Sequence, residues 1–444
     1  MRIERLEVKN FRCLEDITIN FPAKNNIAVI VGINGAGKSA LLDAIAKLLN
    51  SIVVKIQRSS ETVQKSTISG FNSNIEIDDV RVYQSFCSIK ASCDAFKIDL
   101  SRNVEQEKNA KVASRSLDDF ISYLKEKAQV NLLTDYPCFA YYKTYQNIKS
   151  SGKLLNKLKA NKTLENIQLL SYYSCLNINP DDFSDFKNWY ESEENFENEK
   201  RVRENNSYRN PNIALIQKSI ERFLNNLFVS DFSNLRIQRV ETKLNISFIR
   251  NNQASIVSEM FIDKRGQPFK LEQLSSGEKR LLMLVTDLAR RLAIANPGLE
   301  ENAWQGEGIV LIDEIDLHLH PQWQRRVLPA LTKTFPNCQF IVTTHSPQVL
   351  SEVPRESVFI LEDGKLIEYS PHTIGRDSNS ILYEIFGVKE RPEWSQQEID
   401  DCLKLIDNEK WDEARKALKE LSNRLGENDT AVVQAQSILH FMED

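Results

Sequence analysis

The chain has 444 residues, of which 41% are hydrophobic and 27% charged, and its formal net charge is −5 at pH 7. This is the composition of a globular protein with one large or two smaller domains, and the acidic balance argues against coating of nucleic acid by overall charge. No stretch approaches the roughly 18 apolar residues of a membrane span, and the start MRIERLEVKNF lacks the apolar core of a signal peptide. Seven cysteines without C-x-x-C spacing favour reduced thiols and a cytoplasmic location, away from membranes.

The first informative segment is rich in glycine. An apolar run over 27–31 precedes it, and apolar residues at helical spacing follow it up to 49. Gly32-x4-Gly37-Lys38-Ser39 fits the pattern G-x-x-x-x-G-K-[ST], whose backbone N–H groups and following helix N-terminus contact phosphate oxygens. We predict that Lys38 contacts the β- and γ-phosphates of a nucleotide and that the Ser39 hydroxyl ligates Mg2+. The expected nucleotide contacts from this loop are Gly32, Asn34, Gly35, Ala36, Gly37, Lys38, Ser39 and Ala40.

The middle of the chain has a mixed pattern. We expect strands at 82–90 and 95–100 and a helix at 117–127. A stretch with six lysines and no acid follows at 143–162, and one with eight acids and two lysines at 181–200. These are either a nucleic-acid contact and an acidic docking surface or, more simply, two solvated faces of a helical insertion.

A second anion-binding segment is expected at Leu274-Ser275-Ser276-Gly277-Glu278-Lys279-Arg280, after a helix at 212–228 and strands at 235–240, 244–249 and 257–262. Ser275 and Glu278 have the spacing of a capping box that opens an apolar helix. A helix N-terminus with small residues can approach an anion closely. Because the glycine loop already holds one nucleotide, we expect Ser275, Ser276, Gly277 and Glu278 to contact a phosphate bound by another copy of the chain.

Two further strands deliver polar residues at their carboxyl ends. The apolar run from 308 ends in Asp313 and Glu314, the pattern of an aspartate that orients Mg2+ and a carboxylate that polarises an attacking water. After a helix at 322–334, the strand from 338 leads to His345, at the edge where α/β sheets place ligands. We predict that His345 contacts the γ-phosphate. His318 and His320 are two residues apart, which does not favour a metal site outside a strand.

Taken in order, GxNGxGKS, LSSGE, LIDE and TTHS resemble the Walker A, signature, Walker B and His-switch motifs of the ATP-binding-cassette (ABC) ATPases. RIERLEVKNFRCLEDITINF is similar to the opening of the branch that contains RecF, the SMC proteins and the OLD ATPases. The resemblance implies an α/β P-loop head, with a mixed sheet and an antiparallel β lobe, that binds ATP and Mg2+ in a head-to-tail homodimer. It also implies that Asn10 and Arg12 lie near the nucleotide, that Asp316 in a D-loop crosses the dimer interface, and that Gln146 is a Q-loop ligand of Mg2+.

Within that branch the layout is most similar to the predicted ATP-binding proteins that include PtuA, the ATPase of Septu and of certain retron anti-phage systems. About 75 residues follow Glu368, too few for the TOPRIM nuclease domain of OLD proteins. The resemblance therefore implies a regulatory ATPase that controls a separate effector such as an HNH nuclease, with DNA or a retron RNA–DNA complex as a further candidate partner. The alternative is a RecF-like DNA repair or chromosome-maintenance ATPase that binds DNA directly.

The expected domain layout follows from the motif positions. Residues 1–145 would form the N-terminal ATPase lobe, 146–210 a helical insertion, 211–392 the C-terminal ATPase lobe, and 393–444 a tail of three short helices. Asp363-Gly364 predicts a β-hairpin turn within the third segment. For the tail, a cap on its own ATPase and a docking segment for an effector both remain open.

Overall fold

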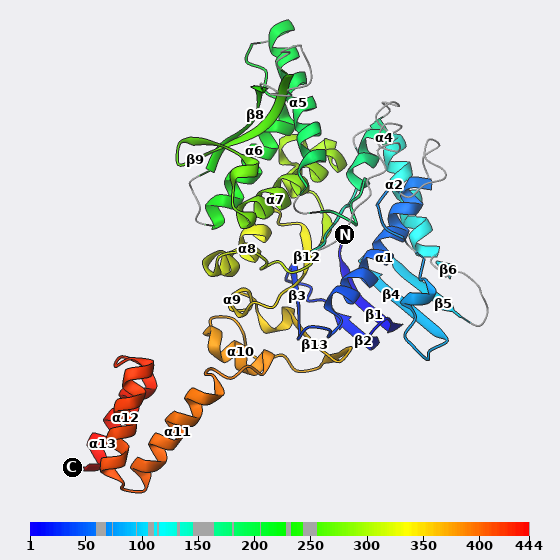
Figure 1. Ribbon diagram of the computed structural model, residues 1–444. Helices are drawn as coiled ribbons and strands as arrows, with labels where there is room; N and C mark the ends of the chain where they lie inside the picture. The colour runs from blue at the N-terminus through cyan, green and yellow to red at the C-terminus, as the bar shows by residue number, and fades with distance from the viewer. Residues whose placement is uncertain are drawn as a thin grey trace, which may run out of the picture. The chain divides into compact units, whose positions relative to one another are not determined.

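The computed structural model describes residues 1–58, 68–72, 74–94, 96–104, 111–112, 115–130, 134–144, 164–179, 182–204, 206–227, 232–242 and 255–443 (Figure 1). The chain divides into two compact units, Met1–Ser378 and Asn379–Asp444. Among the described helices, none is long and apolar enough to cross a membrane.

The centre of the first unit is a six-stranded sheet in the order β14-β13-β3-β12-β11-β7. Its strands are β3 (Ile27–Val31), β7 (Cys138–Tyr142), β11 (Gly308–Ile312), β12 (Cys338–Thr343), β13 (Val358–Glu362) and β14 (Lys365–Ile367). All neighbours pair in parallel except β14, which turns back on β13 through Asp363-Gly364, both with left-handed φ. Because β3, β12 and β11 are parallel neighbours, the segments that follow them meet at one edge. The predicted α/β fold class is confirmed.

An antiparallel sheet in the order β2-β1-β4-β5-β6 forms a second layer. Its strands are β1 (Ile3–Phe11), β2 (Leu14–Asn20), β4 (Phe86–Cys93), β5 (Lys97–Asn103) and β6 (Lys111–Val112). We expected the strand that became β4 to begin at 82, but the backbone turns there: Tyr83 has φ 66° and the Gln84 N–H donates to the Arg81 carbonyl at 3.0 Å. The expected helix at 117–127 is α2 (Arg115–Val130).

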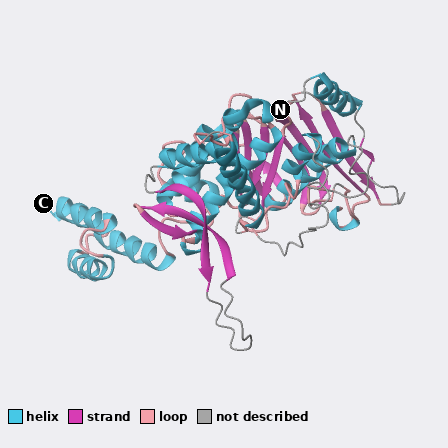
Figure 2. Cartoon of the chain, turned by 90° about the horizontal axis from the view of Figure 1, so that it is seen from above, coloured by secondary structure: helices cyan, strands magenta, loops and turns pink. Residues whose placement is uncertain are grey.

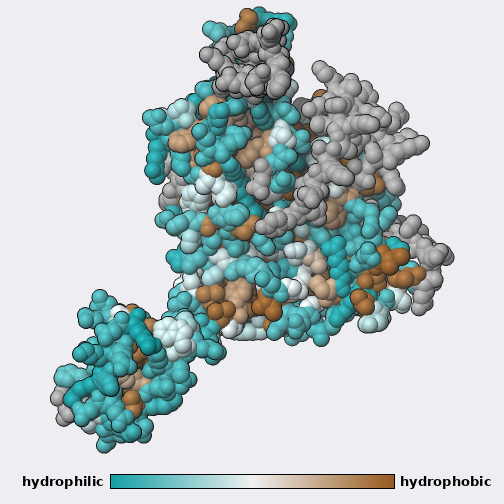
Figure 3. Space-filling view, viewed as in Figure 1, coloured by the Kyte–Doolittle hydropathy of each residue, from teal (hydrophilic) through white to brown (hydrophobic). Residues whose placement is uncertain are grey.

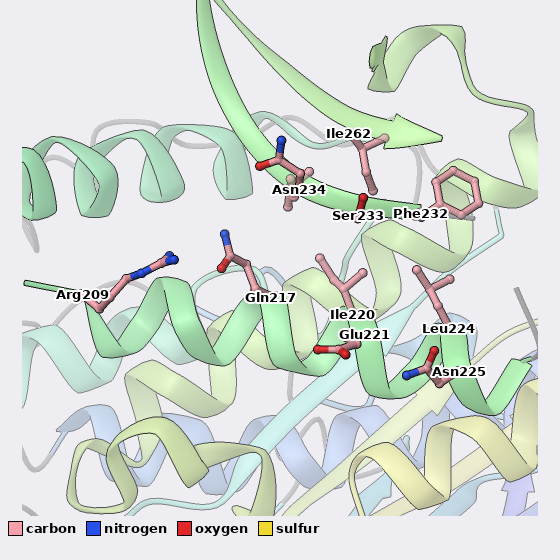
Figure 4. Close-up of a pocket in the computed structure, with 11 residues that line it drawn as sticks. Arg209, Gln217, Ile220, Glu221, Leu224, Asn225, Phe232, Ser233, Asn234 and Ile262 are labelled. Carbon is pink, nitrogen blue, oxygen red and sulfur yellow. The ribbon is translucent and has the colours of Figure 1, made fainter. Parts of the chain in front are cut away.

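A small third sheet carries β8 (Phe232–Thr242), β9 (Ser255–Lys264) and β10 (Gln267–Lys270), and Figure 2 shows it as a group apart from the central sheet. The helices α5 (Ser184–Arg203) and α6 (Pro211–Leu227) adjoin it. Tyr190 is buried and donates to the Leu235 carbonyl at 2.9 Å, whereas Trp189 is only half-buried. A cavity of about 430 Å³ between α6 and β8 has Ile220, Leu224 and Phe232 in its wall (Figure 4).

Parts of the insertion and of this sheet remain untested. The expected strand at 244–249, Gln146 and residues 145–162 of the basic stretch lie outside the described residues. The described helices between β7 and α5 are α4 (Leu164–Leu169) and a 3-10 turn, η2 (Leu170–Tyr172).

Two long helices connect the layers. Helix α1 (Lys38–Arg58) packs into one continuous core with both the antiparallel sheet and the central sheet. Helix α7 (Ser276–Ala295) is buried almost all round, although it carries charged residues. Asp287 receives ion pairs from Arg290 at 2.6 Å and Arg291 at 2.7 Å, and the Tyr142 hydroxyl lies 3.1 Å from the same carboxylate. Burial alone raises the pKa of Asp287, but the Arg291 and Arg290 guanidinium groups lower it to about 2.

The second unit is helical. It contains most of α10 (Ser378–Phe386), then α11 (Glu393–Asp407), α12 (Trp411–Leu425) and α13 (Thr430–Glu443). The three predicted tail helices are present, and their apolar residues form a core of their own, made of Ile399, Cys402, Ile406, Ala414, Leu418, Leu421, Val432, Ala435 and Leu439. Gly426, with φ 94°, ends α12.

We expect Asp287→Asn to lower the free energy of unfolding by about 3–5 kcal/mol, because two buried guanidinium groups lose their carboxylate. Urea denaturation measures this loss. The difference from the wild type should be complete above about pH 4, the range of an unfolded aspartate, and should shrink as the pH falls toward 2 and the wild-type carboxylate protonates. Asp401→Asn, on an exposed position of α11, is the control, and an equal loss in both variants would contradict the assignment.

Candidate nucleotide-binding site

The phosphate loop, residues 32–39, is held tightly between neighbouring turns. A side-chain Cβ at Gly32 would lie 2.3 Å from the Leu361 carbonyl oxygen, and one at Gly37, where φ is 104°, would lie 2.5 Å from Leu14 and 3.0 Å from the Cys13 sulfur. Glycine is therefore required at both positions, because any larger residue would displace backbone or core atoms. The loop forms a cradle whose curvature is set by β1–β2 on one side and β13 on the other.

Lys38 places a buried positive charge in this cradle. Its Nζ donates to the Gly32 and Ile33 carbonyl oxygens, both at 3.0 Å. Burial lowers the pKa of Lys38, while the carboxylates of Asp313, Glu314 and Asp316 oppose that shift. With the N-terminus of α1 beside it, this ammonium group fits an anionic phosphate.

Ser39 and Asp313 meet across the sheet edge. The Ser39 hydroxyl donates to the two Asp313 carboxylate oxygens at 3.2 and 3.1 Å, and the Thr343 hydroxyl donates to one of them at 2.7 Å. A hydroxyl and a carboxylate are hard oxygen donors of the kind that Mg2+ takes. The chemistry of this donor set therefore fits the predicted magnesium site, which would use Ser39 and Asp313.

Glu314 sits in a strained backbone conformation immediately after β11. Its φ is 50°, a region that residues other than glycine, asparagine and aspartate seldom adopt. The Thr343 hydroxyl accepts the Glu314 N–H at 2.8 Å, and the Thr343 carbonyl accepts the Ile315 N–H at 3.0 Å. Thr343 thus fixes the positions of both Asp313 and Glu314. In the sequence, only the place of Thr343 in the TTHS motif, two residues before His345, points to such a role.

His345 and Asp316 extend the site along the same edge. Burial lowers the pKa of His345, as does the charge of Lys38, whereas Asp316, Glu314 and Asp313 act to raise it. His345 therefore shares the electrostatic environment of Lys38 and favours the neutral imidazole. The Asp316 carboxylate accepts from the Thr344 hydroxyl at 2.5 Å, so its side chain is held by the strand that carries His345.

The predicted capping box at the start of α7 is present. The Ser275 hydroxyl accepts from the Glu278 N–H at 3.4 Å, and Glu278 accepts from the Ser275 N–H at 3.0 Å and from Lys264 at 2.7 Å. A Cβ at Gly277 would lie 2.4 Å from the His318 carbonyl oxygen. Gly277 and Glu278 therefore have packing and capping roles within their own chain, and the exposed residues of this helix end are Ser275 and Ser276.

Arg12 pairs with a residue of α1, the helix that begins at Lys38, while Asn10 is bonded to β4. Arg12 pairs with Asp43, one turn after Ser39, at 2.7 Å and with Asp79 at 2.9 Å. The Asn10 amide donates to the Phe86 carbonyl at 3.1 Å. Lys143 adds a second cation beside Arg12 by pairing with Asp43 at 2.9 Å, a contact that no local sequence pattern indicates.

The fold and the residues at the sheet edge define a P-loop ATPase of the ABC type. Residues 1–350 match the family described as AAA ATPase domain, and the chain belongs to that family.

Several relatives carry more specific names. The chain is 27% identical to the Retron Ec83 probable ATPase of Escherichia coli, over 98% of this chain and 86% of the relative. It is 28% identical to the Retron Vc95 probable ATPase of Vibrio cholerae serotype O1 biovar El Tor, over 90% and 81% of the two chains. It is 22% identical to the Septu protein PtuA of Bacillus thuringiensis, over 99% and 93%. The predicted resemblance to the group that includes PtuA and retron ATPases is confirmed. Among solved structures, the SMC head domain from Thermotoga maritima aligns at 16% identity and a TM-score of 0.38, over 84% of this chain and all of that one.

We expect the pKa of His345 in the nucleotide-free protein to lie below its ordinary 6.5 and to rise in Lys38→Met, because a nearby positive charge that opposes imidazole protonation is removed. An NMR titration of the histidine ring protons, assigned with His345→Asn, measures both values. Lys404→Met, which removes an exposed lysine of α11, should leave the pKa of His345 unchanged. The same pKa in Lys38→Met as in the wild type would show that the two side chains do not share a site.

Proposed function

We propose that two copies of this ATPase associate head to tail and enclose two ATP molecules between them, and that hydrolysis controls a separate effector in an anti-phage defence system. One observation carries the dimer. One edge of the central sheet brings together Lys38, Ser39, Asp313, Glu314 and His345. The N-terminus of α7, at residues 275–276, is exposed, and Glu278 and Lys264 of the same chain hold it in place. The phosphate-contacting helix end of one copy is thus free to serve the nucleotide of the other.

Each residue has a role that its surroundings support. Lys38 and the N–H groups of the phosphate loop would bind the β- and γ-phosphates of ATP. Ser39 and Asp313 would hold Mg2+, which when bound neutralises charge on the phosphate oxygens. Glu314 would orient the attacking water and accept its proton, and the neutral His345 would hydrogen-bond the γ-phosphate.

The surface around the phosphate loop supports burial against another copy. Ile33 at the loop tip is 53% exposed, and Val82 and Tyr83 before β4 are 72% and 100% exposed. Arg81 binds Glu15 at 2.7 Å, which keeps this segment next to the β1–β2 turn on which the phosphate loop packs. Figure 3 shows apolar side chains gathered over the part of the view where Figure 1 has β4 and β5. Large exposed apolar side chains in one area are typical of an interface.

The effector is proposed from the relatives, whose names place them in retrons and in Septu. An HNH nuclease fits this setting as the separate effector. The unit 379–444 has its own core and carries 15 acidic and 8 basic residues, so it is a candidate to dock a basic surface of that effector. The relatives do not favour the alternative of a RecF-like repair ATPase. Contact with DNA or an RNA–DNA complex through 143–162 stays a prediction.

We expect Glu314→Gln to lower ATP turnover by about 10²–10⁴-fold, because the amide cannot accept the proton of the attacking water. ATP binding should persist, so the dimer should accumulate when ATP is added. Phosphate release and light scattering measure the two effects. Glu301→Gln, an exposed acid outside the site, is the matched control, and wild-type turnover in Glu314→Gln would remove Glu314 from the proposed role.

A mixing experiment tests whether the site is shared between copies. Lys38→Met should abolish nucleotide binding, and Ser276→Arg should leave it intact while blocking closure by the helix end. Ser276 is chosen because an arginine at Gly277 would collide with the His318 carbonyl of its own chain. An equal mixture of the two inactive variants should regain turnover, up to about a quarter of the wild-type rate, since about half of the dimers are mixed and each has one complete site. Full activity of Ser276→Arg alone would contradict the shared site.

A further inference from the structure

Arg280 lies one turn into α7, directly after the helix end that is proposed to contact the other copy's ATP. Its side chain is buried, and one guanidinium nitrogen donates to the Asp313 carbonyl at 3.0 Å and to the Glu314 carbonyl at 3.3 Å. These two carbonyls belong to the residues predicted to orient Mg2+ and water. A buried arginine that bonds backbone oxygens fixes their position, because moving them would leave a desolvated charge without these acceptors.

The same helix is fastened to the sheet a second time. Asp287, two turns after Arg280, lies 3.1 Å from the Tyr142 hydroxyl at the end of β7. The Tyr142 carbonyl in turn accepts the Asp313 N–H at 2.9 Å. Arg280 and Asp287 are seven residues apart and so project from one face of the helix. Helix α7 therefore holds the end of β11 directly through Arg280 and indirectly through β7.

Arg280 holds the strained backbone at Glu314. Glu314 has φ 50°, a conformation that persists only when its surroundings enforce it. Thr343 enforces it from the side of β12, through the Glu314 N–H, and Arg280 from the side of α7, through the Glu314 carbonyl. Loss of either contact should allow the segment to relax and the Glu314 carboxylate to move.

We propose that Arg280 is a positioning residue for ATP hydrolysis, which holds Glu314 in place and ties that placement to the position of α7. The proposal rests on the proposed function, since it assumes that Glu314 orients the attacking water. In a head-to-tail dimer the N-terminus of α7 contacts the ATP of the other copy, while Arg280 contacts Glu314 of its own copy. Closure over one ATP is thereby transmitted to the hydrolytic carboxylate at the second site.

The test compares Arg280→Gln and Arg280→Lys with Arg222→Gln, which removes an arginine that stacks on Trp304 of the same unit. Arg280→Gln should lower kcat by about 10–100-fold, the usual effect of losing an orienting partner. The Kd for ATP should stay within about twofold of the wild type, since the phosphate loop is untouched. Arg280→Lys, which keeps the charge without the planar fork, should recover part of the rate, and Arg222→Gln should keep the full rate.

Two readouts separate positioning from general stability. Hydrogen exchange at the Glu314 and Ile315 amides should speed up in the Arg280 variants and stay unchanged in Arg222→Gln. The double variant Arg280→Gln/Glu314→Gln should turn over ATP within about twofold of Glu314→Gln alone, because both changes remove one function. Wild-type kcat in Arg280→Gln, or a further multiplicative loss in the double variant, would overturn the proposal. If Arg280→Gln does not fold, the same measurements on Arg280→Lys decide the question. Wild-type turnover in Glu314→Gln would instead contradict the proposed function, and so can be told apart from a failure of the role of Arg280.

Discussion

The hydrogen bond between the Ser39 hydroxyl and the Asp313 carboxylate joins residues that are 274 positions apart in the chain. It forms because β3, β12 and β11 are parallel neighbours, so that the phosphate loop, the Asp313-Glu314 turn and His345 leave the sheet at one edge. Every other feature of the site depends on this arrangement. Thr343 can fix Glu314, and Lys38 can share the environment of His345, only because the strand order places these segments side by side.

The sequence predicted the parts of the fold that depend on local spacing. The glycine loop, the Ser275–Glu278 capping box, the Asp363-Gly364 turn and the three tail helices all follow from patterns within a few residues. It did not predict the start of β4, because a left-handed Tyr83 is not readable from an apolar alternation. It also did not show that the His318 carbonyl of the same chain lies so close to Gly277 that only glycine fits there.

The contacts that the sequence could not predict are those between distant residues. Arg280 with the Asp313 and Glu314 carbonyls, Asp287 with Tyr142, and Arg12 with Asp43 each connect segments that only the tertiary fold brings together. A buried helix such as α7 is expected to present apolar side chains such as leucine to its surroundings. Charged residues at buried positions lose their hydration, which lowers the stability of the fold unless they are paired. Arg280 and Asp287 lie in the helix that begins at the proposed dimer contact, and they tie that helix to the hydrolytic turn and to β7.

The central claim is that a triphosphate gripped by one copy is covered by the α7 N-terminus of its twin. Cryo-electron microscopy of the Glu314→Gln protein with ATP and Mg2+ tests this directly. The account predicts density for two nucleotides, each with Lys38 of one copy and Ser275 or Ser276 of the other within about 3 Å of phosphate oxygens. Nucleotide bound in the phosphate loop with residues 275–276 of every copy remote from it would contradict the account.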